Sequence, residues 1–165
     1  MNFWGKSSRA TKFTNVKCTS FAKEFADFEY CYLKSINRSY KYVSIRLNLF
    51  KTPVTKVKFN GALYKRYNGY RPFMYNITVD ACRFLKDPTS NPVINYLFEF
   101  SQGYSNINGT CPINHDIIID KLPNGFVFNR ITKVLPFPEG DYKLATHWIA
   151  YDTYKAEVSI YGSLT

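Results

Sequence analysis

Two long stretches of this chain alternate apolar and polar residues with a period of two, and this alternation constrains the fold more than any other feature. The stretches span residues 40–50 and 56–64. Because successive side chains of a β-strand point to opposite faces, this pattern predicts strands with one buried and one solvated face. The apolar positions on the predicted buried faces are Val43, Ile45, Leu47, Leu49, Val57, Phe59 and Leu63.

Shorter strand signals occur along the rest of the chain, separated by residues typical of turns. They are expected at residues 12–19, 28–36, 73–81, 115–122 and, as a hairpin, 141–162. The pair Asn68-Gly69 marks one of the turns. One helix is expected from Pro92, where Leu97 and Phe98 follow helical spacing. Many short strands with one short helix predict a mainly β fold, a sandwich or a barrel.

The length of 165 residues is that of one domain. Residues 12–165 are expected to form this domain, and the polar residues 1–11 to form a flexible N-terminal arm. The apolar runs are only a few residues long, as at residues 117–119, so no transmembrane helix is expected.

The chain has four cysteines, and none of them forms a CxxC pair. An even number of widely spaced cysteines indicates two disulfides, for which three connectivities are possible. We favour Cys18 with Cys31 and Cys82 with Cys111, because the first pair would close a hairpin and the second would tether the helical segment. The alternative is four reduced, buried thiols in a cytosolic protein.

Two signals bear on an extracellular location and they disagree. N-glycosylation sequons begin at Asn37, Asn76 and Asn108, although chance alone would produce about two in a chain of this composition. At the start of the chain, however, no signal peptide is visible, because the apolar run that such a peptide requires is missing. A secreted glycoprotein therefore remains an expectation.

The positive charge of the chain is concentrated in its first half. The formal net charge is +10, and residues 1–75 contain fifteen Lys or Arg against three acids. This asymmetry favours an anionic partner, such as a membrane surface or an acidic receptor, although it is equally typical of a solvated basic face. Nucleic acid is a weaker candidate, because residues 64–75 interleave basic and aromatic residues without any known nucleic-acid-binding motif.

No pattern in the sequence specifies a reaction. The two histidines, His115 and His147, lack the spacing of a zinc site. His147 lies in an alternating strand and is expected to be structural. His115 follows Cys111 by four residues, but Cys111 is better explained by a disulfide than by a nucleophile. We therefore predict no enzyme, no metal and no cofactor.

The remaining hypothesis is a container for an apolar ligand. Aromatic residues make up 18% of the chain, so a disulfide-linked sandwich could leave its sheets apart and line the gap with apolar side chains. A filled core is the commoner outcome. The candidate cavity residues are Val43, Ile45, Leu47, Leu49, Val57, Phe59, Leu63, Ile77, Val79, Leu97, Phe98, Leu144, Trp148, Val158 and Ile160. Of these, Leu97 and Phe98 would form a lid.

Five segments of the chain resemble a large insect family of uncharacterised secreted proteins, expanded in flies and similar to the CheB chemosensory proteins. The segments are KFTNVKC (12–18), EYCYLKSINRSYKY (29–42), FNGALYKRYNGYRPFMYNITVDAC (59–82), FLKDPTSNP (84–92) and LPFPEGDY (135–142). Members of that family usually begin with a signal peptide, and this chain departs from that pattern. The resemblance implies that the four cysteines form disulfides.

That family is in turn distantly similar to the ganglioside-activator and ML lipid-recognition domains. The similarity lies in the segment LPFPEG, the following Gly140-Asp141-Tyr142 and the C-terminal hairpin. It implies an immunoglobulin-like (ML-type) β-sandwich that opens between its sheets to take lipid. The implied function is that of a secreted, non-catalytic carrier of a lipid or hydrocarbon, in chemosensation or pheromone perception. The alternative is a protein-interaction module that docks its basic face on an acidic receptor or membrane.

Overall fold

The computed structural model describes residues 11–99, 102–107, 109–123 and 137–165. The expected N-terminal arm, except Thr11, and the sequon at Asn108 lie outside these residues. The strands are β1 (Thr11–Ser20), β2 (Ala26–Ser35), β3 (Lys41–Leu49), β4 (Val57–Tyr67), β5 (Gly69–Asp80), β6 (Ile117–Pro123), β7 (Gly140–Ala150) and β8 (Thr153–Leu164). The helices are α1 (Ala81–Lys86) and α2 (Pro92–Glu99), with 3₁₀ turns η2 (Pro88–Ser90) and η3 (Gln102–Tyr104).

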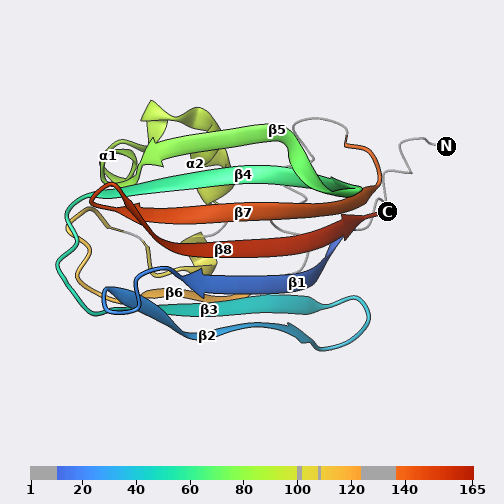
Figure 1. The fold of residues 1–165 in the computed structure, drawn as a ribbon, viewed down its shortest axis with the longest axis horizontal. Coiled ribbons are helices and arrows are strands. Elements are labelled where there is room, and N and C mark those ends of the chain that lie inside the picture. The colour runs from blue at the N-terminus through green and yellow to red at the C-terminus, as the bar shows by residue number, and fades with distance from the viewer. Residues whose placement is uncertain (1–10, 100–101, 108, 124–136) are drawn as a thin grey trace.

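The strands form two antiparallel sheets that pack face to face (Figure 1). One sheet has five strands in the order β1-β8-β7-β4-β5, and the other has three in the order β2-β3-β6. The predicted fold class, a mainly β sandwich with two disulfides, is confirmed. The expected helix is α2, and the shorter α1 precedes it.

Turn chemistry sets the register of the C-terminal hairpin. The two residues between β7 and β8, Tyr151 and Asp152, both have positive φ angles, of 52° and 62°. This is the backbone of a type I′ turn, whose twist matches that of the flanking strands. The turn places Leu144 of β7 opposite Ile160 of β8, and both side chains face the second sheet.

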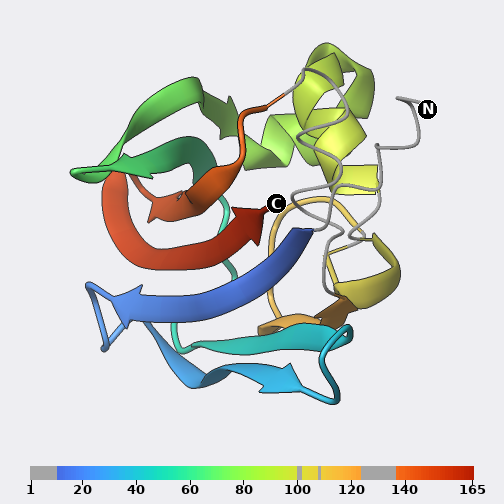
Figure 2. The same ribbon diagram turned by 90° about the vertical axis from the view of Figure 1, so that its right-hand side faces the viewer.

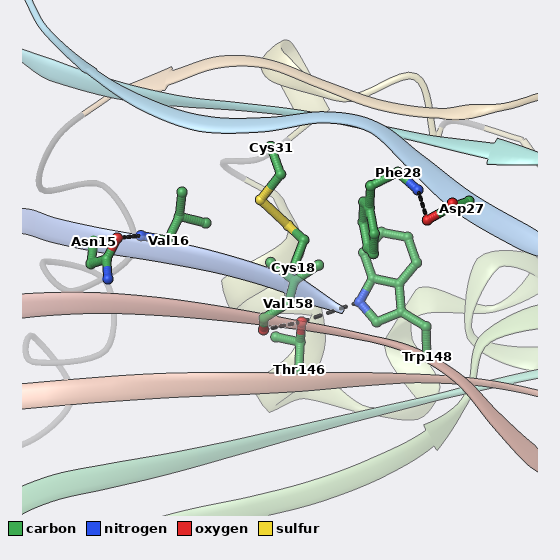
Figure 3. Close-up of a disulfide and its surroundings, with 9 residues drawn as sticks. All are labelled: Asn15, Val16, Cys18, Asp27, Phe28, Cys31, Thr146, Trp148 and Val158. Carbon is green, nitrogen blue, oxygen red and sulfur yellow. Dashed lines mark hydrogen bonds between the residues drawn. A yellow bond between two sulfur atoms is a disulfide. The ribbon is translucent and has the colours of Figure 1, made fainter. Parts of the chain in front are cut away.

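Both of the favoured disulfides are formed. Cys18 of β1 and Cys31 of β2 link the two sheets directly, with their Cα atoms 6.3 Å apart (Figure 3). Cys82 of α1 is bonded to Cys111, which precedes β6, across 29 positions of sequence. The first disulfide therefore links the two sheets at one side of the sandwich. The second ties the helical segment to the connection that leads into β6.

The interior is divided between two clusters of buried side chains. The larger includes Phe13, Val43, Phe137 and Tyr142, all less than 4% exposed. The second gathers where the β1–β2 and β3–β4 connections meet, and it includes Phe25, Val54, Leu47, Ala150 and Ala156. A cavity lies between the sheets, and residues of both clusters line it.

Candidate functional site

A cavity of about 330 Å³ lies between the two sheets. Its walls are the inward faces of β3, β4, β5, β6, β7 and β8, together with α1, α2 and the segments that flank the sheets. Several inward-facing residues, such as Phe59, Leu144 and Trp148, are only half-buried because they border this space. The volume is at the lower end of the range of roughly 300–1,000 Å³ that is usual for small-molecule pockets.

Most of the apolar positions that the sequence singles out line this cavity. They are Ile45, Leu47, Leu49, Val57, Phe59, Leu63, Ile77, Val79, Phe98, Leu144, Trp148, Val158 and Ile160. Val43 does not line it; it is fully buried in the cluster that contains Phe13 and Tyr142. Leu97 belongs to α2, but its side chain lies outside the described part of the structure.

The structure adds lining residues that alternation in the sequence does not reveal. Most of them come from connections and short helices, and two come from β6; they are Phe25, Val54, Phe84, Leu85, Ile94, Ile107, Ile113, Ile117 and Ile119. The short apolar run at residues 117–119 was the one visible signal among them. The others follow no period of two, because they do not lie in strands.

The helical segment between β5 and β6 lies beside one edge of the sandwich (Figure 2), and residues of α1 and α2 line the cavity. Asp80 begins α1, because its side chain accepts a hydrogen bond of 3.1 Å from the backbone N–H of Arg83. Phe84 of α1 packs edge-to-face on Phe98 of α2, with ring centroids 5.4 Å apart, and both rings line the cavity. The disulfide of Cys82 holds this aromatic pair over the gap between the sheets.

The polar side chains of Thr146, Trp148 and Ser105 in the lining are engaged within the protein. The indole N–H of Trp148 donates to Oγ1 of Thr146 at 3.1 Å, and Thr146 donates to the carbonyl of Val158 at 2.8 Å (Figure 3). Oγ of Ser105 accepts from the backbone N–H of Ile107 at 3.0 Å. These three side chains therefore offer a ligand little hydrogen bonding, and a polar part of the ligand would need a partner elsewhere in the lining.

Both histidines lie outside the cavity. His147 is on the outer face of the five-stranded sheet, where its Nδ1 is 3.2 Å from Oδ1 of Asn60 and its Nε2 is 3.4 Å from a carboxylate oxygen of Glu157. His115 is near the backbone carbonyl of Asp116, at 2.8 Å from Nδ1. Because Cys111 is bonded to Cys82, a Cys–His nucleophile does not form there.

Across the described ranges, no three His, Cys, Asp or Glu side chains come together in a way that could hold a metal ion. The helices among the same residues are too short or too polar to span a membrane.

No curated protein matches this chain. A solved structure that matches it is that of a Niemann-Pick type C2 protein from the Japanese carpenter ant. The two chains are 14% identical over 92% of this chain and 90% of that chain, with a TM-score of 0.34.

A family of known sequences also matches, through residues 59–144. It is described as protein of unknown function (DUF1091). The matched residues run from β4 through the helical segment and β6 into β7, so they include much of the cavity wall. Because this match covers more than half of the 165 residues, the chain belongs to the DUF1091 family of proteins of unknown function.

Proposed function

We propose that this protein binds a lipid or hydrocarbon-like ligand in the cavity between its sheets, without catalysing a reaction. The observation that carries the proposal is an apolar cavity of about 330 Å³ in a domain of only 165 residues. Well-packed interiors contain few voids larger than a water molecule. A cavity of this size in a small domain is therefore better explained by an occupant than by imperfect packing.

The physical chemistry of the walls favours an apolar occupant. An acyl or alkyl chain that leaves water for such a site gains about 0.8 kcal/mol for each buried methylene group. It would also restore the dispersion contacts that the wall residues lack on their inner side. Water would gain little there, because Thr146 and Trp148 already hydrogen-bond within the protein.

The biological setting of the proposal rests on other features. Two disulfides are typical of proteins that fold in an oxidising compartment, which favours secretion. The sequons at Asn37 and Asn76 are exposed, so both could carry glycans in a secreted protein. The resemblance to the CheB proteins extends the proposal to a role in chemosensation or pheromone perception.

Native mass spectrometry provides the first test of binding. The protein would be secreted from insect cells behind a supplied leader, and its native and denatured masses compared after glycan removal. The expected result is a co-purified apolar ligand on an otherwise homogeneous protein. The denatured mass should show the loss of four hydrogens that two disulfides require.

A cavity-filling variant tests where the ligand binds. Gly61 lines the cavity, and a Cβ atom there would lie 3.7 Å from the Phe59 ring, which is an ordinary contact. G61L should lower the affinity for methyl palmitate at least tenfold and leave the protein folded. T19L, at an exposed position of β1, is the matched control. Unchanged affinity in a folded G61L would contradict the proposed site.

The basic surface supports a second candidate, a module that docks on an acidic receptor or an anionic membrane. Lys34, Arg38, Lys51 and Arg71 are exposed, and none of them is within ion-pair distance of a carboxylate in the described part of the chain. Docking through these charges should weaken as salt rises from 0.05 to about 0.5 M, because surface charges are then screened. Burial of an acyl chain should persist under the same titration.

A further inference from the structure

We propose that the ligand is a single-chain fatty acid and that Lys155 binds its carboxylate. This inference rests on the proposed function and names the ligand class of the same cavity. It starts from the charges that the described residues bring to the lining, which are two lysines, Lys58 and Lys155, and no acidic residue. A cavity with only positive charge in its walls is suited to an anionic head on an apolar chain.

The two lysines differ in whether their charge is already compensated. Nζ of Lys58 lies 3.3 Å from a carboxylate oxygen of Asp152, so this ammonium group has an anion within the protein. For Lys155, no carboxylate of the described residues lies within ion-pair distance. Lys155 is therefore the cationic group of the lining that is available to a ligand.

The position of Lys155 follows from an irregularity in the β7–β8 ladder. Trp148 is paired with Ala156 and Ile149 with Tyr154, so Lys155 is the extra residue of a β-bulge. A bulge redirects a side chain relative to the regular alternation of its strand. The bulge is near the start of β8, and β8 begins at the end of the sandwich away from the C-terminus (Figure 1).

The Lys155 ammonium group lies against an aromatic ring of the lining. Its Nζ lies over the ring of Phe25, 4.7 Å from the centroid, and Phe25 is itself a lining residue that is only 8% exposed. The Lys155 side chain is half-buried. A ring face is a weaker partner for an ammonium group than a carboxylate, which makes a charge-assisted hydrogen bond. A fatty acid would supply that carboxylate while its chain fills the cavity.

The volume of the cavity limits the number of chains. At about 330 Å³ it lies near the lower limit of small-molecule pockets. One acyl chain is therefore a better match than the two chains of a phospholipid. A neutral hydrocarbon would fill the same space but would leave the Lys155 ammonium group without an anion.

The test compares two ligands with the same chain, palmitate and methyl palmitate. Trp148 lines the cavity and reports binding by its fluorescence once the other tryptophan is removed by W4F. In this background the protein should bind palmitate about tenfold more tightly than the ester, as expected for one partly exposed charge-assisted hydrogen bond. K155M should abolish this preference, so that palmitate binds no more tightly than the ester in the same variant, and K155R should retain it.

The matched control is K17M, because Lys17 also lies over an aromatic ring, that of Tyr161 at 5.6 Å, but does not line the cavity. K17M should keep the preference for palmitate. Equal affinities for the two ligands in the W4F protein, or an unchanged preference in K155M, would overturn the fatty-acid inference alone. If neither ligand binds the W4F protein, the proposed function fails with it.

Discussion

The two ends of the sandwich are built from the same strands but are filled differently. Near the C-terminus, the rings of Phe73, Phe137 and Tyr142 pack on one another with centroids 5.5–5.8 Å apart. Farther along β7, Leu144 and Trp148 point in the same inward direction but border the cavity. The difference teaches that alternation decides which face is buried, whereas the side chains from the opposite sheet decide whether the space is filled.

The largest effect is expected from emptying the filled end. Phe13 is fully buried in the larger cluster, which also contains Tyr142 and Phe137. F13A should lower the free energy of unfolding by about 3–5 kcal/mol, because the transfer and cavity costs add in a closely packed site. Denaturant unfolding monitored by circular dichroism measures this change. A loss below about 1 kcal/mol would mean that this end is not close-packed.

Removal of each disulfide should affect a different property, the stability of the sandwich in one case and the shape of the cavity in the other. C18A/C31A removes the link between the sheets, which closes a separation of 13 residues, and should cost about 3 kcal/mol. C82A/C111A instead frees the segment that presents Phe84 and Phe98 to the cavity, so its main effect should be on methyl palmitate affinity. Unfolding curves and Trp148 fluorescence measure the two quantities. Equal loss of affinity in both variants would contradict this division.

The strands of both ends could be predicted from the sequence, but the cavity could not. Val43 and Ile45 are consecutive inward positions of β3 and both belong to the larger cluster, yet of the two only Ile45 also lines the cavity. What separates them is the position of distant residues such as Phe13, and no local pattern encodes that. The alternation of apolar and polar residues therefore identified residues of the cavity wall, but it also selected buried residues that do not line the cavity.

Helix α1 and Lys155 were missed for different reasons. Helix α1 has only six residues, too few to show an apolar period, and its clearest signal is the N-cap residue Asp80. Lys155 reads as a solvated position in an alternating strand, because the bulge that redirects it depends on how β8 pairs with β7. By contrast, the pairing of cysteines that we favoured among three possible ones is the pairing that forms, since each disulfide joins segments that the expected elements bring together.

A smaller effect is expected from trimming the cavity wall. Leu144 is half-buried and already borders empty space, so L144A removes fewer contacts than a substitution in the filled end. It should lower the free energy of unfolding by about 1 kcal/mol. It should also admit a longer chain, which a comparison of methyl esters of 16 and 20 carbons by Trp148 fluorescence can measure. A loss as large as that of F13A would show that both ends are equally well packed.

The smallest effect on stability is expected from acid, and it should act on the end of the sandwich that contains the cavity, the hollow end. Asp116 joins β3 to the start of β6: its carboxylate accepts from the Leu49 backbone N–H at 2.9 Å and pairs with Arg46 at 2.9 Å. The hydrogen bond from Leu49, and next the one from Arg46, hold the pKa of Asp116 below its ordinary value of 3.8. Its contribution to stability is therefore complete above that ordinary value and is lost as the pH falls through the lower pKa of the folded state.

Substitution of Asp116 tests this assignment, since D116N should be less stable than the wild type at neutral pH and the difference should shrink as the pH falls below 3.8. D152N is the matched control, because the pKa of Asp152 is also lowered, by hydrogen bonds from Lys56 and then Lys58, but this carboxylate is exposed at the β7–β8 turn. Its ion pairs are screened by water and should contribute less. Thermal unfolding between pH 7 and pH 3 compares the three proteins. If the curves of D116N and the wild type stay parallel over this range, the link from β3 to β6 does not depend on the charge of Asp116, and the hollow end is held together by apolar packing alone.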